Sequence, residues 1–167
     1  MSTEMDTASG PSASVDGLDG PEFRSWISLV HAYGHVSKSL DRSLTQELDI
    51  SLVWFEVLAR LSTAEDGRMR LLQLSRHLVV SKASVTKLVD RMERAGLVRR
   101  ETPPEDRRAV YAALTPSGEA MLAKALPLQV RNIRAALSGV GRSELDSLRE
   151  TLDGVIRTYD DTWRTHG

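Results

Sequence analysis

Hydrophobic and polar residues recur with helical spacing along most of the chain, and the central stretch from Leu71 to Thr115 is the most informative part. Between Lys82 and Arg94 the apolar side chains stand at positions i, i+3, i+4 and i+7, which predicts a helix with one buried stripe. That stripe consists of Val85, Leu88, Val89 and Met92. A shorter helix is predicted just before it. Gly96 follows where a left-handed helix cap is typical, and Leu97-Val98 begins a strand.

The residues after Gly96 predict a β-hairpin. A Pro-Pro-Glu-Asp turn at residues 103–106 separates the outgoing strand from a returning strand at residues 110–114, and Arg107 and Arg108 lie near the tip. Two short helices joined by a tight turn and followed by a basic hairpin are the order of a winged helix-turn-helix. The fold class that we predict is mainly α (α+β).

Long helices are predicted on both sides of this module. One spans residues 21–48, and a second runs from a capping Ser51 to Ala64, before a short strand at residues 68–70. After the hairpin, Thr115 is expected to cap a helix that Pro127 kinks, and Ser143 to cap the last helix. The last helix has an apolar seam at heptad-like spacing, made of Leu145, Leu148, Leu152, Val155, Tyr159 and Trp163.

The flanking helices are too long and too apolar to cover only a small module, so we expect a second copy of the chain to cover them in a two-fold homodimer. We therefore divide the chain into four parts. These are a flexible tail (1–20), an N-terminal helix that contributes to dimerisation (21–48), the winged helix-turn-helix module (49–115) and C-terminal dimerisation helices (116–167).

Charge is distributed unevenly along the chain. The whole chain holds 22 Lys and Arg against 23 Asp and Glu, whereas residues 68–108 hold eleven basic and five acidic residues. The rest of the chain is left with eleven basic and eighteen acidic residues. A basic surface on an acidic body is typical of a protein that binds a polyanion such as duplex DNA.

Several classes of protein are excluded or unsupported. The chain contains no cysteine, which excludes disulfides, thiolate zinc sites and thiol-based redox sensing. It has no apolar run long enough for a membrane helix and no secretory signal pattern, so we expect a soluble, cytoplasmic protein without a membrane partner. Ser84 and Lys87 match a Ser-x-x-Lys motif of acyl enzymes, but its companion motifs are absent. We expect no enzyme and no cofactor.

The order of elements and several motifs resemble the MarR family of bacterial transcription regulators. The segment from Ser84 to Arg100 is similar to the family's recognition helix and its exit into the wing. Asp106-Arg107-Arg108 followed by Leu114-Thr115 is similar to the family's wing pattern. The resemblance implies a homodimer that binds a pseudo-palindromic operator, most simply as a repressor. It covers residues 22–163 and leaves the tail unmatched.

The resemblance also implies which residues contact DNA. Those expected at the major groove are Lys82, Ala83, Ser84, Thr86 and Lys87. Arg108 would enter the minor groove, where negative potential attracts guanidinium. Asp106 would hold Arg108 or the wing backbone, and Arg107 would meet a phosphate. Arg91 is expected either to contact phosphate or to brace the wing internally.

The family's members often respond to small aromatic or phenolic acids. Aromatic walls with cationic or imidazole groups suit such a ligand. The candidate lining residues are Arg24, Trp26, His31, His35, Trp54 and Phe55, although aromatic residues at helical spacing are also usual in a core. Gln129 departs from many relatives, which place a histidine there, and this weakens a direct transfer of phenolate binding.

Two alternatives remain open at this point. His31 and His35 are four residues apart on one helix and share a face, a spacing that suits one metal ion if a carboxylate such as Asp41 joins them. A metal-responsive regulator is therefore one alternative. The simpler interpretation of the two histidines is that they only pack at the dimer interface. The other alternative is a winged-helix module whose basic face binds an acidic protein.

Overall fold

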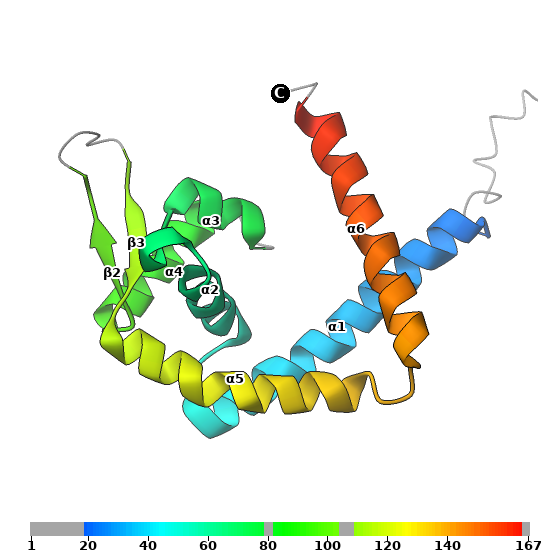
Figure 1. Ribbon diagram of the computed structural model, residues 1–167, viewed down its shortest axis with the longest axis horizontal. Coiled ribbons are helices and arrows are strands. Elements are labelled where there is room, and N and C mark those ends of the chain that lie inside the picture. Colours follow the sequence, from blue (N-terminus) through cyan, green and yellow to red (C-terminus); the bar gives the residue numbers. More distant parts are fainter. Residues whose placement is uncertain (1–18, 79–81, 104–108, 165–167) are drawn as a thin grey trace, which may run out of the picture. The chain divides into compact units, whose positions relative to one another are not determined.

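In the computed structural model, residues 19–78, 82–103 and 109–164 are described, without the side chains of 82–83 and 160–164. The helices are α1 (Pro21–Leu48), α2 (Leu52–Ser62), the 3-10 turn η2 (Glu65–Gly67), α3 (Leu71–His77), α4 (Lys82–Arg94), α5 (Pro116–Ala136) and α6 (Arg142–Arg164). The strands are β1 (Arg68–Arg70), β2 (Val98–Glu101) and β3 (Tyr111–Leu114). Figure 1 follows this order by colour. The predicted fold class is confirmed.

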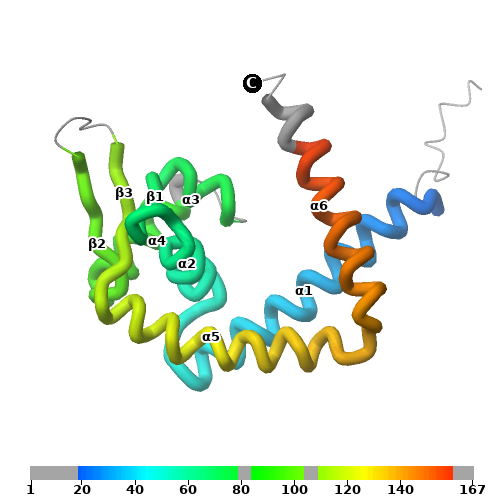
Figure 2. The backbone as a smooth tube through the Cα atoms, in the orientation of Figure 1, coloured from blue at the N-terminus to red at the C-terminus, as the bar shows by residue number. Residues whose placement is uncertain are grey.

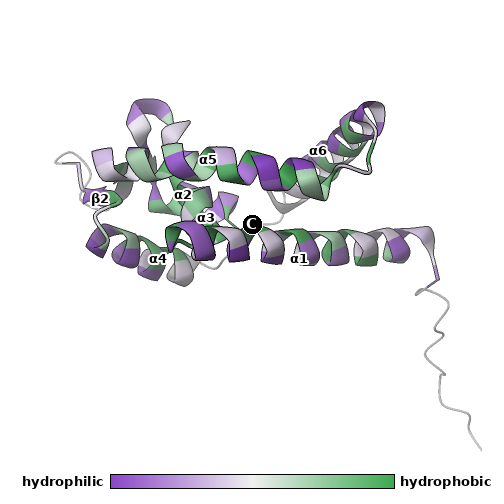
Figure 3. Ribbon diagram, turned by 90° about the horizontal axis from the view of Figure 1, so that it is seen from below, coloured by the Kyte–Doolittle hydropathy of each residue, from purple (hydrophilic) through white to green (hydrophobic). Residues whose placement is uncertain are grey.

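The chain forms two compact units, one that ends at Lys38 and one that begins at Ser39, so the boundary falls inside α1. Each unit is described by itself. The first contains the N-terminal part of α1, where most side chains are exposed. The second contains the end of α1 and all the following elements. Figure 3 shows hydrophobic and hydrophilic residues alternating along α1 and α5.

The three strands form one antiparallel sheet in the order β1-β3-β2 (Figure 2). Arg70 lies opposite Tyr111 in the first pair, and Glu101 lies opposite Tyr111 in the second. Side chains alternate across a strand, so Val98 and Arg100 share one face of β2 while Arg99 and Glu101 share the other. Val98 is buried, which identifies its face as the inner one.

The core of the second unit is a single apolar cluster built from the sheet and from α1, α2, α3, α4 and α5. Leu44, Val57, Leu58, Leu61, Leu74, Val89 and Met92 are fully buried in it. The stripe predicted on the segment from Lys82 to Arg94 is confirmed, because Val85, Leu88, Val89 and Met92 all belong to the cluster. Ala125 and Leu128 of α5 complete it, and α5 packs on α2.

Most predicted caps are confirmed. Ser51 Oγ accepts a hydrogen bond from the Trp54 N–H at 3.4 Å, and Asp41 Oδ1 from α1 accepts one from the Leu52 N–H at 2.7 Å. Two oxygens therefore satisfy amides at the start of α2. Gly96 has φ of +73°, as a left-handed cap requires.

The predicted cap at Ser143 is wrong. Helix α6 already begins at Arg142, and Glu144 Oε2 reaches back to accept a hydrogen bond from the Gly141 N–H at 2.7 Å. Gly141 therefore precedes the helix, and Glu144, three residues later, binds its amide as in a capping box. The helix after Thr115 continues through Pro127 to Ala136.

Candidate nucleic-acid interface

Helix α4 presents a face of short polar and cationic side chains to solvent. Opposite its buried stripe, Ser84, Thr86, Lys87, Arg91 and Arg94 are all exposed. A hollow of about 440 Å³ runs along this face and is lined by Ser84, Lys87, Asp90, Arg91 and Arg94. Guanidinium and ammonium groups on a helix surface are the groups that meet phosphates and guanine edges in duplex DNA.

The acidic residues of α4 are engaged by the neighbouring strand. Asp90 forms an ion pair with the Arg100 guanidinium, and Arg100 Nη2 donates a hydrogen bond to the Thr86 carbonyl oxygen at 3.0 Å. Glu93 Oε1 accepts a hydrogen bond from the backbone N–H of Arg100 at 2.8 Å. The Asp90 charge is therefore balanced by Arg100, which leaves the cations of α4 to dominate the field on its outward face.

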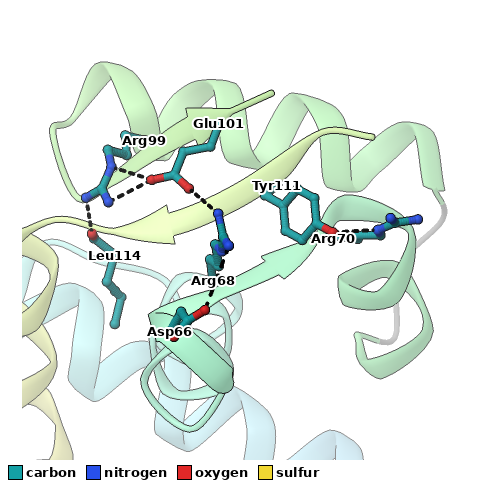
Figure 4. A network of polar contacts seen from close by, with 7 residues as sticks. All are labelled: Asp66, Arg68, Arg70, Arg99, Glu101, Tyr111 and Leu114. Carbon is teal, nitrogen blue, oxygen red and sulfur yellow. Dashed lines mark hydrogen bonds and ion pairs between the residues drawn. The ribbon is translucent and has the colours of Figure 1, made fainter. Parts of the chain in front are cut away.

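The outer face of the sheet carries a separate polar network (Figure 4). Glu101 pairs with Arg68 at 3.3 Å and with Arg99 at 2.7 Å, and Arg70 Nε donates to the Tyr111 hydroxyl at 2.8 Å. Both Arg68 and Arg70 place the guanidinium carbon 5.4 Å from the centre of the Tyr111 ring. The hydrogen bond from Arg99, with support from Arg68, lowers the pKa of Glu101. These side-chain contacts link β1, β3 and β2 across the outer face of the sheet.

A tight joint connects the end of α4 to the start of α5. Thr115 Oγ1 donates to the Gly96 carbonyl oxygen at 2.6 Å and accepts from the Gly118 N–H at 3.0 Å. A Cβ on Gly118 would lie 2.1 Å from the Leu97 carbonyl oxygen, so the backbones approach too closely for any side chain. The first turn of α5 is therefore fixed on the turn that ends α4.

The predicted DNA contacts fall into three groups. Ser84, Thr86, Lys87 and Arg91 are exposed on α4, and three of them, all except Thr86, line its hollow. Lys82 and Ala83 belong to the first turn of α4, but their side chains are outside the described part of the chain. The wing residues Asp106, Arg107 and Arg108 also lie outside the described residues.

The predicted ligand-binding residues are divided between the two units. Arg24, Trp26, His31 and His35 are exposed on the first part of α1. Trp54 and Phe55 are half-buried on α2 and pack against the core, as the simpler interpretation of aromatic residues at helical spacing expects.

The proposed metal ligands gain no support from the described residues. No three His, Cys, Asp or Glu side chains within them are grouped closely enough to hold a metal ion. The suggested third ligand, Asp41, instead binds the backbone N–H of Leu52.

Sequence reasoning missed two buried or half-buried polar residues. Its charge alone suggests that Arg100 faces solvent. Arg100 is two residues after buried Val98 on β2, however, and this spacing places it on the inner face of the strand, toward α4. Gln129 is 1% exposed, and its Nε2 donates to the Leu40 carbonyl oxygen at 3.3 Å. Among the described residues its Oε1 has no hydrogen-bond partner. Its polar side chain alone did not indicate burial, which depends on contact with Leu40, 89 residues away in the chain.

None of the described helices combines the length and the apolar character needed to cross a bilayer. The family model for the MarR family matches residues 50–110, which include α2, the sheet-forming strand β1 and the α3–α4 pair. The HTH-type transcriptional regulator YkoM of Bacillus subtilis is 38% identical over 94 residues, or 56% of this chain and 60% of YkoM. The HTH-type transcriptional repressor YetL of the same species is 34% identical over 102 residues, or 61% of each chain. The chain thus spans about 60% of the length of these relatives.

Solved structures share the fold over a larger part of the chain. Sco3205, a MarR family transcriptional regulator from Streptomyces coelicolor whose structure is in complex with DNA, matches with a TM-score of 0.77 and 27% identity. That match covers 84% of this chain and 92% of Sco3205. AbsC, another MarR family regulator from Streptomyces coelicolor, has a TM-score of 0.76 and 26% identity over 85% of this chain and 97% of AbsC. These relatives are transcription regulators and not enzymes, in agreement with the sequence. The family match and the shared winged-helix fold together show that residues 50–110 form a MarR family domain.

Proposed function

We propose that the chain is a transcription regulator that binds duplex DNA by placing α4 in the major groove. The observation that carries this proposal is the outward face of α4, where Lys87, Arg91 and Arg94 surround a hollow while Arg100 balances the charge of Asp90. Such a surface offers several charge-assisted contacts to phosphates and few repulsive ones. Sco3205, which is 27% identical, forms a complex with DNA.

In this proposal Lys82, Ala83, Ser84, Thr86 and Lys87 approach the bases and nearby phosphates. Arg91 contacts phosphate, because it is exposed and lines the hollow, while within the described residues the brace to β2 is made by Arg100. The wing residues Asp106, Arg107 and Arg108 keep the roles that the family resemblance implies for them. Arg108 enters the minor groove, Asp106 orients it, and Arg107 meets a phosphate.

The regulator acts as a homodimer in this proposal. The single chain leaves groups of large apolar side chains exposed on α1, α5 and α6, including Trp26 (59%) on α1 and Val155 (58%) and Tyr159 (60%) on α6. Apolar patches of this kind mark interaction surfaces in soluble proteins. A two-fold dimer reads two half-sites whose centres are one helical turn apart, about 34 Å, which fits a pseudo-palindromic operator.

The test is binding to the promoter region beside the protein's own gene, measured by fluorescence anisotropy at several salt concentrations. With about eight phosphates neutralised per dimer, log K should fall with log salt with a slope near −7. Lys87→Gln should weaken binding at every sequence and reduce that slope by about 1 to 2 per dimer. Lys124→Gln, the same change at an exposed position on α5, is the matched control and should leave the slope unchanged.

Arg108→Ala tests the wing separately. It should weaken operator binding while the dimer stays intact in sedimentation. A shallow salt dependence, or equal affinity of the wild-type protein for DNA and for an acidic polypeptide, would favour the protein-interaction module instead.

The proposed mode of regulation is repression, relieved by a small aromatic or phenolic acid. Its support is the family's frequent response to such ligands, together with the part of Trp54 and Phe55 that stays exposed beside the core of the second unit. Arg24, Trp26, His31 and His35 are the further candidate contacts. Titrating the protein–operator complex with a panel of aromatic acids should release DNA with at least one member. If chelation weakens operator binding and His31→Ala mimics it, the metal-responsive alternative replaces this one.

A further inference from the structure

Arg100 occupies an unusual place for a cation in a nucleic-acid interface. It belongs to β2, at the base of the wing, and its side chain lies on the inner face of that strand. Only 27% of the side chain is exposed, about half the 56% exposed for its neighbour Arg99 on the outer face. The two arginines thus carry the same charge on the same strand but meet different surroundings.

Arg100 holds one flank of α4 along two turns. Its guanidinium bridges the Asp90 carboxylate and the Thr86 carbonyl oxygen, and its backbone N–H binds Glu93 Oε1. Thr86, Asp90 and Glu93 follow one another at i, i+4 and i+7, so they line one side of the helix. The contacts therefore fix both the distance and the rotation of α4 relative to β2.

The rotation of α4 decides which side chains face outward. At about 100° per residue, Lys87 and Arg91 lie roughly 90° to 130° around the helix axis from the centre of the Arg100 contacts, on the adjoining face. If α4 turned about its axis by only 30°, the tips of these long side chains would move by several ångströms, about the width of one hydrogen-bonding position. A group that sets this rotation consequently affects contacts that it does not make itself.

Asp90 would oppose DNA binding if it were left unpaired. It lines the same hollow as Lys87, Arg91 and Arg94, so a free carboxylate would stand next to the phosphates that these cations bind. Arg100 places a positive charge against it and holds it on the strand side of the helix. One side chain thus positions α4 and removes a like-charge repulsion.

We propose that Arg100 is a positioning residue for DNA recognition, which acts through Thr86, Asp90 and Glu93 of α4 and not through a phosphate contact of its own. This proposal rests on the proposed function, since it concerns how α4 is presented to DNA. It assigns Asp90 a favourable role in DNA binding despite its negative charge. That role is the feature which separates positioning from direct contact.

The experiment uses the full chain and its operator, with Arg100→Met, Asp90→Asn, the double variant and Arg99→Met as the matched control. Arg100→Met keeps the length of the side chain and removes its charge and hydrogen bonds. Arg99→Met removes the same charge from the next residue, on the face away from α4. The folded fraction of each variant is measured by circular dichroism at the temperature of the binding assay, so that unfolding is not mistaken for weaker binding.

Positioning predicts that Arg100→Met and Asp90→Asn each weaken operator binding by about tenfold, the usual scale for breaking a hydrogen-bonded charge pair. The double variant should bind about as weakly as either single one, because both remove the same interaction. The salt slope should stay within error of the wild type, and Arg99→Met should change affinity by less than about twofold, as for an exposed surface charge. Arg100→Lys should recover only part of the loss, since an ammonium lacks the planar fork of guanidinium.

Direct contact predicts the opposite sign at Asp90. If Asp90→Asn tightens binding, or if Arg100→Met lowers the salt slope by about 1 to 2 per dimer, Arg100 meets phosphate and the positioning role is overturned. Unchanged affinity in both single variants also overturns it. Amide hydrogen exchange of the DNA-free protein gives a separate reading, because Arg100→Met should speed exchange across residues 98–101. If the wild-type protein itself fails to bind the operator, the proposed function fails, while the exchange result still tests the brace.

Discussion

Gly118 is the position where a single added methyl group should have the clearest effect. An added Cβ would lie 2.1 Å from the Leu97 carbonyl oxygen and 3.1 Å from Leu114 Cδ2. A carbon ordinarily stays about 3.3 Å or more from a carbonyl oxygen, so the α4–β2 turn and the start of α5 must separate by about 1 Å. Leu97 contributes a backbone atom here, and no side-chain rotation relieves the contact.

The expected magnitude for Gly118→Ala follows from three opposing effects. Overpacking costs about 1–3 kcal/mol, and weakening the Thr115 cap costs about 1 kcal/mol more. Alanine returns about 1 kcal/mol through its higher helix propensity. The net loss in the free energy of unfolding is therefore about 1–3 kcal/mol, which lowers the melting temperature of a chain of this length by roughly 2–12 °C.

Thermal melts followed by circular dichroism, at one fixed protein concentration, measure this change. Gly154→Ala in α6 is the matched control, since the nearest atom to its added Cβ is the end of the Arg157 side chain at 3.8 Å. That variant should melt at the same temperature as the wild type or slightly higher, because helix propensity acts there without a clash. If Gly118→Ala melts no lower than Gly154→Ala, the close joint between α4 and α5 does not exist as described.

Three further predictions concern pH and assembly. Arg99 and Arg68 lower the pKa of Glu101 in the folded protein, so the stabilisation from Glu101 is present near neutral pH and is lost as pH falls through the folded pKa. Glu101→Gln should therefore flatten the acid side of a plot of urea midpoint against pH. An unchanged plot would contradict the network. Burial raises the pKa of Glu56 against the opposing effect of Arg60, so Glu56→Gln should raise the urea midpoint at pH 7 and lose that gain at about pH 4, where the unfolded carboxyl also protonates. Val155→Glu should dissociate the dimer, as measured by sedimentation, and abolish operator binding. Ser147→Glu, on the polar side of α6, should do neither. If the dimer survives Val155→Glu, this helix does not hold it together.

Periodicity predicted the elements around the recognition module closely because their local signals agree with the tertiary structure. The segment predicted from Lys82 to Arg94 is α4 with the same bounds, and Gly96 has the positive φ that ends it. Its apolar stripe has a single possible direction, toward the core. Propensity, capping and packing all favour the same helix there.

The remaining features depend on contacts between residues distant in sequence or on competing local options. Ser143 has the usual chemistry of a cap, but Glu144 can reach the Gly141 amide and the helix starts earlier. Arg100 shows the same limit, since its charge suggested solvent or DNA while its partners lie 7 to 14 residues away on α4. The alternation of side chains along β2 indicated which face Arg100 occupies. Only the packed structure shows that α4 supplies a carboxylate and a carbonyl oxygen on that face.

Asp41 and Leu44 affect how recognition modules can be exchanged between relatives. Both lie before the winged helix-turn-helix module (49–115). Asp41 nevertheless caps α2, the first helix of that module, and Leu44 is fully buried in its core. A chimera that transplants only residues 49–115 would pair the new α2 with a foreign cap and a foreign core residue. A graft that begins at Ser39 carries both along. For swapping operator specificity between relatives, the transferable unit therefore starts within the first helix and not at the loop that follows it.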